Sequence, residues 1–445
     1  MAIANSGILE MIKVYYAKAG VANLLYRNDD LLKKLGNSAS RIEGKSANFS
    51  ALYSRGGAVS ADATVAVSLA NVTAQAKEFA VTPGQLFSAC VYNNKEVLAS
   101  KSMAGAYVPI ATAKMFAALE SFRKTLAVAL YGSGHGELFT LGDDFTAMVV
   151  GTDIEQTWPT SAIFGVDIGS EVVYKATVDA LDSAAVAAGK VVAVDPTAGK
   201  VTIRPSIAGT PLTGHVVCIK GCTDSDGKPM LPVGLGGWLP NKDIPASDNF
   251  FGVNRSAARE RLAGVRYAPT ATEPKYLSIE KALLAVQSYG SNADMIVMNT
   301  SDVLELQQEV EGKTQFLKAP GQKGKLNVGV DGIGIGIIGT FLDKIISSPY
   351  CPKGTAYVLD SETVKLWTYS NADKVDDKAA EFKAIKEVEG GENVSDKPYQ
   401  MLVDDIFTLN PSSITSDGAG TLVLVNFYGE FVVTDPSKNA VIQFK

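Results

Sequence analysis

A histidine and two cysteines in the middle of the chain are the first candidates for chemistry. His215, Cys218 and Cys222 form an H-x2-C-x3-C pattern, and these are ligand types that zinc prefers. A structural zinc site needs a fourth ligand, and the sequence has no second cluster that would supply it. The intervening residues include valine and isoleucine, which favours a buried strand with free cysteines. We therefore expect no metal site here.

A glycine-rich segment could bind a nucleotide. Gly334, Gly336 and Gly339 spell G-x-G-x-x-G, and Asp360 follows about 20 residues later, as in dinucleotide-binding folds. The next residues reach Pro349 without helical spacing, so no helix N-terminus is expected to receive a pyrophosphate. A cytosolic α/β enzyme that binds a nucleotide at this loop is nevertheless the alternative function.

Other polar clusters favour structure over catalysis. The segment G-S-G-H-G-E at 132–137 lacks a G-x-S-x-G motif and predicts a loop that ends a helix. The chain has only two histidines, so acid–base chemistry at neutral pH would fall to carboxylates or lysines. The adjacent acids at 143–144 and 404–405 are typical of solvated turns. We expect no catalytic residue, no cofactor and no enzymatic activity.

Composition limits the class of protein. The chain has 445 residues, 46% of them hydrophobic and 20% charged, which is typical of a globular protein with two or three domains. It has 41 basic and 47 acidic residues, and a net charge of −6 argues against a main role in gripping nucleic acid, though not against enclosing it.

Targeting signals and cysteines narrow the class further. No apolar run of about 18 residues predicts a membrane span, and the first residues do not read as a signal peptide. Four cysteines are too few for a disulfide framework. We expect an intracellular product, which disfavours a third possibility, a secreted β-rich surface protein.

A long β-type segment with almost no charge runs from Ser46 to about Val91. In its first arm, Val65, Val67 and Leu69 alternate with small residues, which predicts a strand with one apolar face. Such a hairpin is marginal by itself and would be sticky unless other copies cover it. This segment therefore predicts assembly.

The second arm of this segment is less regular. It runs from Phe79 to Val91, and Pro83 and Gly84 interrupt it, which predicts an edge strand with a bend. Asp62 is the only ionisable residue between positions 56 and 75.

The clearest single element is a helix that follows this β-type segment. Residues 109–131 start with a proline suited to a first helical turn and continue with apolar residues at helical spacing. Glu120 and Lys124 are spaced as an i,i+4 pair on the outer face, and Gly132 and Gly134 end the helix.

The chain then changes character. Short strands broken by Gly, Pro and Asp predict a small β-rich module inserted at 161–240. Beyond it, Ser278 and Ser301 are placed to cap helices on either side of a buried strand at Met295–Met298. This helix–strand–helix order predicts an α/β subdomain.

The C-terminal part contains a charged stretch and apolar strands. Residues 373–392 are strongly charged, which predicts a solvated helix or excursion. Leu422–Phe427 and Glu430–Thr434 predict a terminal hairpin with Tyr428 and Gly429 at its turn.

The order of these parts resembles the major capsid proteins of tailed bacteriophages, which have the Hong Kong 97-like fold. The resemblance covers nearly the whole chain and is carried by Phe79-Ala-Val-Thr-Pro-Gly, Val97-Leu-Ala-Ser-Lys-Ser-Met-Ala-Gly-Ala-Tyr, Ile345-Ile-Ser-Ser-Pro-Tyr-Cys-Pro-Lys-Gly-Thr-Ala-Tyr-Val-Leu-Asp and Leu422-Val-Leu-Val-Asn-Phe.

The resemblance implies an α+β fold with six parts. These are an N-terminal arm (1–45), an extended β-hairpin loop (46–100), a peripheral domain with a spine helix (101–160), the β-rich insertion domain (161–240), an axial α/β domain (241–370) and closing strands shared by the axial and peripheral domains (371–445).

The implied function is structural. The subunit would self-assemble as hexameric and pentameric capsomers into an icosahedral shell that encloses double-stranded DNA without binding it specifically. The implied partners are a separate scaffolding protein, a portal and decoration proteins, with no membrane. The implied location is the virion capsid, assembled in the host cytoplasm.

The hairpin supplies the candidate contacts between subunits. Charges at its base and in its second arm could form ion pairs worth about 0–1 kcal/mol each, which would set register more than affinity. The candidate contact residues are Arg41, Lys45, Arg55, Val65, Val67, Leu69, Lys77 and Glu78.

Overall fold

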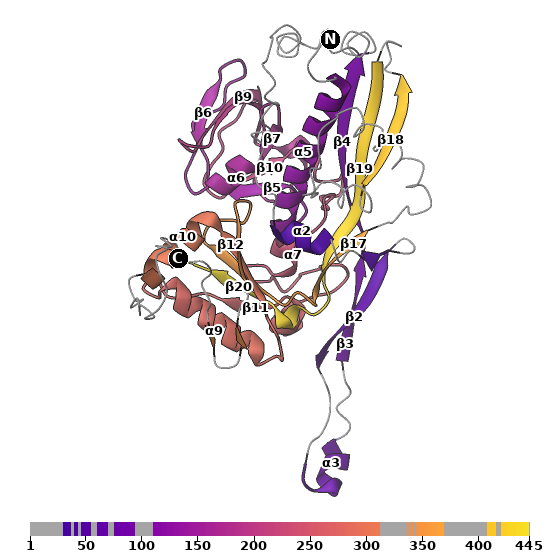
Figure 1. The fold of residues 1–445 in the computed structure, drawn as a ribbon, viewed down its shortest axis with the longest axis vertical. Helices are drawn as coiled ribbons and strands as arrows, with labels where there is room; N and C mark the ends of the chain where they lie inside the picture. Colours follow the sequence, from indigo (N-terminus) through magenta and orange to yellow (C-terminus); the bar gives the residue numbers. More distant parts are fainter. Residues whose placement is uncertain are drawn as a thin grey trace, which may run out of the picture. The chain divides into compact units, whose positions relative to one another are not determined.

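The computed structural model shows a mixed α+β chain that divides into two units (Figure 1). The first unit draws on residues 85–126 and 369–428, and the second on 29–84, 127–368 and 429–445. The residues described are 30–36, 40–42, 46–54, 60–69, 75–93, 110–311, 336–337, 340–341, 344–368, 407–414 and 420–444.

The first unit is a helix on an antiparallel sheet. Strand β19 (Gly420–Val433) pairs with β18 (Phe407–Ile414) and with β4 (Gly84–Asn93). Helix α5 (Ile110–Tyr131) lies against these strands, and the Phe122 ring meets Phe427 edge-on at 6.4 Å. This aromatic contact fixes the helix to the sheet.

Helix α5 confirms the helix expected at 109–131, but the assignment of its outer face was wrong. Glu120 and Lys124 are both buried, and Glu120 forms an i,i+3 ion pair with Arg123 at 3.3 Å. A charged pair at this spacing predicts a solvent-facing surface from the sequence. The long aliphatic parts of such side chains nevertheless allow them to be buried in the fold.

Strand β19 replaces the expected terminal hairpin. Tyr428 and Gly429 lie inside one continuous strand, and residues 429–433 pair with β17 (Val364–Thr368) in the second unit. The hairpin prediction was wrong because these residues have partner strands on distant parts of the chain, which a local turn pattern does not reveal.

The second unit contains a hairpin of β2 (Ala47–Ser54) and β3 (Gln75–Val81), paired from Ala47↔Val81 outward. The segment between these strands carries helix α3 (Ala63–Leu69), so the strand predicted for Val65, Val67 and Leu69 was wrong. The Asp62 carboxylate accepts a hydrogen bond from the Thr64 amide at 2.8 Å and caps this helix. Without a neighbouring strand, a helix satisfies the backbone groups locally.

Residues beyond Pro83 do not continue the hairpin. They form β4, which pairs with β19 in another sheet, so the predicted second arm ends at β3. Proline has no N–H for a strand ladder, and the chain changes sheet at this position.

A six-stranded antiparallel sheet forms one end of the second unit (Figure 1). Its order is β5-β10-β7-β8-β9-β6, and helix α6 (Thr160–Phe164) covers it. The strands are β5 (Glu137–Thr140), β6 (Ile154–Thr157), β7 (Glu171–Lys175), β8 (Ala187–Asp195), β9 (Lys200–Ile207) and β10 (Val216–Ile219). The short strands expected within 161–240 are confirmed as β7, β8, β9 and β10. The boundaries of an insertion domain stay a prediction.

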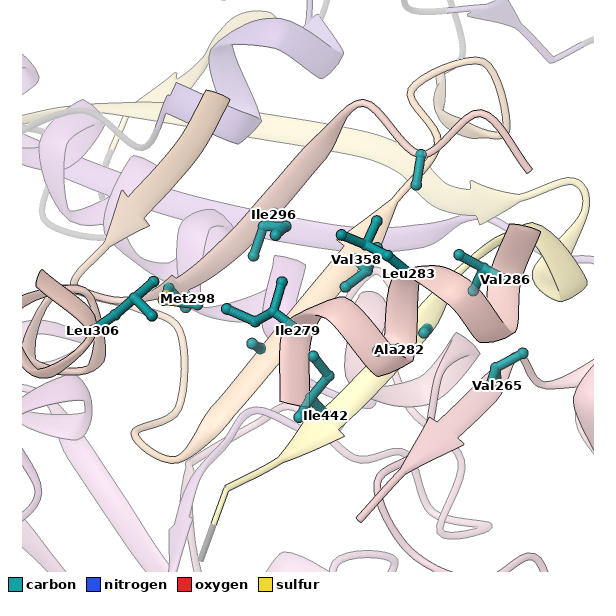
Figure 2. Close-up of a cluster of buried hydrophobic side chains, with 13 residues drawn as sticks. Val265, Ile279, Ala282, Leu283, Val286, Ile296, Met298, Leu306, Val358 and Ile442 are labelled. Atoms are coloured by element: carbon teal, nitrogen blue, oxygen red, sulfur yellow. The ribbon is translucent and has the colours of Figure 1, made fainter. Parts of the chain in front are cut away.

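A five-stranded mixed sheet with order β11-β20-β16-β12-β15 forms the α/β part of this unit. Its strands are β11 (Val265–Tyr267), β12 (Met295–Asn299), β15 (Lys344–Ser348), β16 (Thr355–Leu359) and β20 (Ala440–Gln443). Helices α9 (Lys275–Gln287) and α10 (Thr300–Glu311) pack on it. Figure 2 shows Ile279 and Leu283 of α9 on the side of the helix that faces Ile296 and Val358 of the sheet, and Val286 belongs to the same cluster.

The two helices are confirmed, but their caps differ from expectation. Ser278 is buried inside α9, and Pro274 precedes that helix. Asn299 caps α10, because its side-chain oxygen accepts a hydrogen bond from the Ser301 amide at 2.9 Å.

Short elements complete the described residues. They are α2 (Asp30–Gly36), β1 (Ser40–Arg41), α7 (Leu235–Trp238), α8 (Arg259–Leu262), β13 (Gly336–Ile337), β14 (Thr340–Phe341) and the 3₁₀ turns Asp182–Ala184, Ser256–Ala258 and Pro436–Lys438. None of the described helices is both long and apolar enough to span a membrane. The charged excursion predicted at 373–392 lies outside the described residues.

Candidate assembly surface

The base of the hairpin is held by a cluster of aromatic rings. Phe79 of β3 and Trp238 of α7 are completely buried, with ring centroids 5.5 Å apart. Phe49 of β2 stacks on Phe79 at 5.2 Å and meets Trp367 of β17 edge-on at 5.9 Å. Rings at these separations attract one another beyond the area that they bury. Both hairpin strands are therefore anchored by large apolar side chains.

Polar contacts lock the same cluster. The Trp238 indole N–H donates to the Phe431 carbonyl at 2.6 Å, and the Ala80 amide donates to the Phe251 carbonyl at 3.0 Å. Phe251 has a φ of +48°, unusual for a residue with a bulky side chain. The surrounding contacts must hold this backbone conformation in place.

An arginine closes the cluster on one side. The Arg255 guanidinium lies 3.9 Å from the centroid of Phe250, which itself packs edge-on against Trp238 at 4.9 Å. The same guanidinium forms a buried ion pair with Asp248 at 2.8 Å and donates to the Gly237 carbonyl at 2.7 Å. The ring cluster is thus tied to the loop at 237–255 by a cation that is itself neutralised.

A buried carboxyl lies where the hairpin ends. Glu430 of β19 is 1% exposed and accepts hydrogen bonds from the Gly84 amide at 3.0 Å and from the Val233 amide. Burial raises the pKa of this carboxyl well above its ordinary value, against the opposing effect of the two amide donors. A Cβ at Gly84 would meet the Pro232 nitrogen at 2.4 Å, so only glycine allows this approach.

The predicted contact residues fall into three groups. Val65 and Val67 are exposed on α3, at 44% and 73%, and Leu69 ends that helix. Lys77 and Glu78 are exposed on β3, where Glu78 accepts a hydrogen bond from the Asn48 side chain at 3.0 Å.

Of the other three predicted contact residues, one lies in a short strand before the hairpin and two lie outside the described residues. Arg41 is in β1, paired with Thr368 of β17. Lys45 and Arg55 lie outside the described residues. The structure therefore places two apolar residues together on α3 and a charged pair together on β3, and their role between subunits stays a prediction.

The residues with metal-ligand spacing have structural surroundings. The His215 ring nitrogen Nδ1 accepts a hydrogen bond from the Leu212 amide at 3.1 Å. Cys218 and Cys222 are buried free thiols, and burial raises the pKa of each to about 12. A metal binds the thiolate, which such burial disfavours. Within the described residues, no group of three His, Cys, Asp or Glu side chains is placed to hold a metal ion.

The glycine-rich segments are also structural where they are described. Gly134 has a φ of +92°, and His135 joins Ser133 Oγ and the Gly227 carbonyl, each at 3.2 Å. In the nucleotide-like motif, Gly336 belongs to β13, which pairs with β14 as antiparallel strands rather than leading into a helix. Gly334 and Gly339 lie outside the described residues.

Sequence reasoning missed the anchor at the base of the hairpin. Trp238, Phe250 and Phe251 form a dense aromatic group in a stretch that reads only as loop and turn. The sequence does carry a signal for the burial of Glu430. It is the single acidic residue in a largely apolar stretch that continues with Phe431 and two valines. An acid in such a run is expected to be buried with partners.

Comparison with known proteins supports a fold but no named sequence family. No protein-family model matches this chain, and no curated protein matches its sequence. The capsid asymmetric unit of cyanophage A-1(L) is similar in structure, with a TM-score of 0.56, 11% identity and 98% of each chain covered.

Two further solved structures resemble the chain more weakly. The capsid of an empty GTA particle has a TM-score of 0.48 at 10% identity, covering 99% of this chain and 97% of the other. The holo-SrpI encapsulin of Synechococcus elongatus has a TM-score of 0.44 at 8% identity, covering 100% and 96%. The cyanophage likeness is the one that carries the fold assignment, because it extends over 98% of both chains: this protein has the fold seen in the cyanophage A-1(L) capsid.

Proposed function

We propose that this protein is a capsid subunit that self-assembles into an icosahedral shell around a phage genome. The observation that carries this proposal is the structural likeness to the cyanophage capsid over 98% of both chains.

The parts of a Hong Kong 97-like subunit are assigned here as part of the proposal. Residues 1–45 are the N-terminal arm, and β2, α3 and β3 lie in the extended loop at 46–100. The peripheral domain at 101–160 has α5 as its spine helix, and the six-stranded sheet belongs to the insertion. The five-stranded sheet with α9 and α10 is the core of the axial domain at 241–370, and β18 and β19 are among the closing strands after 371.

The hairpin is the element proposed to lie over a neighbouring subunit. Its base is anchored by Phe49, Phe79 and Trp238, so both strands are held in place at that end. Its far segment, α3, exposes Val65 and Val67 to solvent in the single chain. Apolar side chains on a small helix are stabilised when another surface covers them, which supports contact with a second copy.

The proposed assembly has several kinds of partner. The subunit forms hexameric and pentameric capsomers with itself, aided by a separate scaffolding protein, and joins a portal and decoration proteins. It encloses double-stranded DNA without specific binding, because its net charge of −6 does not attract phosphates. Assembly takes place in the host cytoplasm and yields a virion capsid.

A non-enzymatic role is proposed over the nucleotide-binding alternative. The antiparallel pairing of Gly336 with Phe341 in β13 and β14 does not supply the helix N-terminus that a pyrophosphate requires. Tight binding of a nucleotide that is lost on Gly336→Val would revive the enzyme alternative.

Electron microscopy and sedimentation of the purified protein test the proposed function. The protein is expressed with and without neighbouring phage head genes, so that a missing scaffolding protein does not hide assembly. Closed shells or capsomer rings are expected in at least one arm. A homogeneous monomer or dimer in both arms would reject the capsid function.

A further inference from the structure

Two arginines in the second unit share one acidic partner that is almost fully exposed. Arg259 of α8 and Arg266 of β11 approach the Asp243 carboxylate, with nitrogen–oxygen distances of 3.6 Å and 2.5 Å. The Asp243 side chain is 94% exposed, while the arginine side chains are 23% and 24% exposed. One solvated carboxylate therefore serves two half-buried guanidinium groups.

The positive charge at this place is only partly compensated. The Arg259 guanidinium also donates to the Pro240 carbonyl at 2.9 Å, which is a neutral acceptor. The buried Nε atoms of Arg259 and Arg266 have no acceptor among the described residues, so Asp243 is the one carboxylate in contact with both groups. Burial and the neighbouring Arg266 and Arg255 lower the pKa of Arg259, although Asp243 and Glu260 act in the opposite direction. Arg255 has its own partner in Asp248, and Glu260 accepts a hydrogen bond from the Tyr289 hydroxyl. A further anion on the exposed edges of the two guanidinium groups would balance their charge.

The hairpin carries the complementary group. Asp62 is exposed at the start of α3, and it forms no ion pair with any described residue of its own chain. Its carboxylate accepts a hydrogen bond from the Thr64 amide, and its backbone bonds with the Ser60 hydroxyl and the Ala66 amide. It is the only charge in a segment of small and apolar residues. Once a neighbouring surface covers that segment, an unpaired carboxylate becomes costly and needs a cation.

We propose that Arg259 and Arg266 form a carboxylate-binding site for a second copy of this chain, occupied by Asp62 of that copy's hairpin. This inference rests on the proposed function, in which the hairpin lies on a neighbouring subunit. Guanidinium groups suit this role because their planar donors bind a carboxylate in two-pronged geometry. The pairing selects the docking position of the hairpin, since every other side chain around Asp62 is uncharged.

A carboxylate fits the site better than a nucleic-acid phosphate. The exposed Asp243 carboxylate already contacts both arginines. Its negative charge repels a nucleic-acid backbone, which carries many charges, more strongly than it repels a single carboxylate. The chain carries 47 acidic against 41 basic residues, so copies of it present many carboxylates to one another.

Zero-length cross-linking of the assembled protein tests the pairing. In the variant Arg259→Lys the site keeps its charge and gains an amine that a carbodiimide joins to a touching carboxylate. Mass spectrometry is expected to find Lys at position 259 linked to Asp62 of another copy, and Asp62→Asn is expected to remove that link. Asparagine keeps the oxygen that caps α3, so folding of the tip is preserved. The natural pair Lys200–Glu155, with atoms 2.5 Å apart on the surface, serves as the internal control for the reaction within one chain.

Assembly supplies the second measurement. The paired variants Arg259→Gln and Arg266→Gln, and separately Asp62→Asn, are expected to raise the subunit concentration at which half of the protein assembles by on the order of tenfold. Unchanged assembly of Asp62→Asn together with no link at position 259 would overturn this inference while leaving the proposed function intact. Lower DNA content in shells of unchanged yield would assign the arginines to phosphates and would also overturn it. Failure of the unmodified protein to assemble under any condition would reject both.

Discussion

The Glu430 side chain is buried, ionisable and hydrogen-bonded to two separate segments of the backbone. Its carboxyl is buried and joins the first residue of β4 to the loop at Val233 by accepting two backbone N–H groups. A carboxylate satisfies both donors, whereas burial opposes the charge. The balance makes this residue sensitive both to substitution and to pH.

Replacing Glu430 with glutamine is expected to lower the free energy of unfolding by about 1–3 kcal/mol, because the new amide N–H₂ faces a backbone donor. The raised pKa of Glu430 also sets a pH dependence. Its stabilising contribution is fully present below the unfolded pKa and is lost as the pH rises through the folded pKa. The stability advantage of the wild type over Glu430→Gln should therefore shrink as the pH rises.

Urea unfolding of both proteins between acid and neutral pH checks this expectation. Glu362→Gln, at an exposed acid, is the matched control and should change little. An advantage of the wild type that grows with pH would show that the folded-state pKa of Glu430 is not raised.

Phe79 is the largest completely buried side chain of the hairpin strands. It is completely buried among Phe49 and Trp238. Phe79→Ala should lower the free energy of unfolding by about 3–5 kcal/mol. Urea unfolding monitored by tryptophan fluorescence measures this loss. Leu52→Ala in the same hairpin removes a side chain that is 51% exposed and should cost well under half of that. Equal losses would mean that the aromatic cluster does not anchor the hairpin.

At the scale of elements, the hairpin allows the folding of the subunit to be tested separately from its assembly. β2 and β3 pair along residues 47–54 and 75–81 and are anchored at their base, whereas α3 lies between them in the sequence. The apolar side chains buried at the base favour one register of β2 against β3, so a shorter connection of suitable geometry is expected to preserve the pairing.

Replacing residues 57–74 with a short turn is expected to leave a folded subunit that no longer forms shells. Circular dichroism and urea unfolding would report the fold, and electron microscopy the particles. Shells of normal yield and geometry from this variant would reject the role of the hairpin in assembly.

A single substitution on α3 offers a milder version of this test. Val67→Glu places a charge on a side chain that is 73% exposed, so the free subunit should fold normally while assembly weakens. Ile168→Glu, at 71% exposure in the six-stranded module, is the matched control and should assemble as the wild type does. Equal effects on assembly would show that α3 has no special place in it.

For the whole molecule, the charge balance predicts how the shell treats its contents. With a net charge of −6, the purified subunit should not retard duplex DNA in a gel at about 0.15 M salt. Particles made with the other head genes should still protect DNA from nuclease. Tight DNA binding by the free subunit would contradict enclosure without specific contact.

Local patterns in the sequence were sufficient for elements that carry their own evidence. Helices α5, α9 and α10 show apolar residues at helical spacing, and β12 is a short apolar run between two of them. The resemblance to phage capsid proteins also came from the sequence, through the order of the parts. These features depend on residues that are close together in the chain.

Tertiary structure decided whatever depends on a distant partner. Val65 and Val67 alternate like a strand, but no strand of the described residues pairs with them, and they form a helix. Residues 428 and 429 read as a turn but lie in one long strand because β17 and β18 pair with its two ends. The aromatic cluster and the amide partners of Glu430 come from segments far apart in sequence. Periodicity records which side of an element is apolar, whereas only the folded chain determines what covers that side.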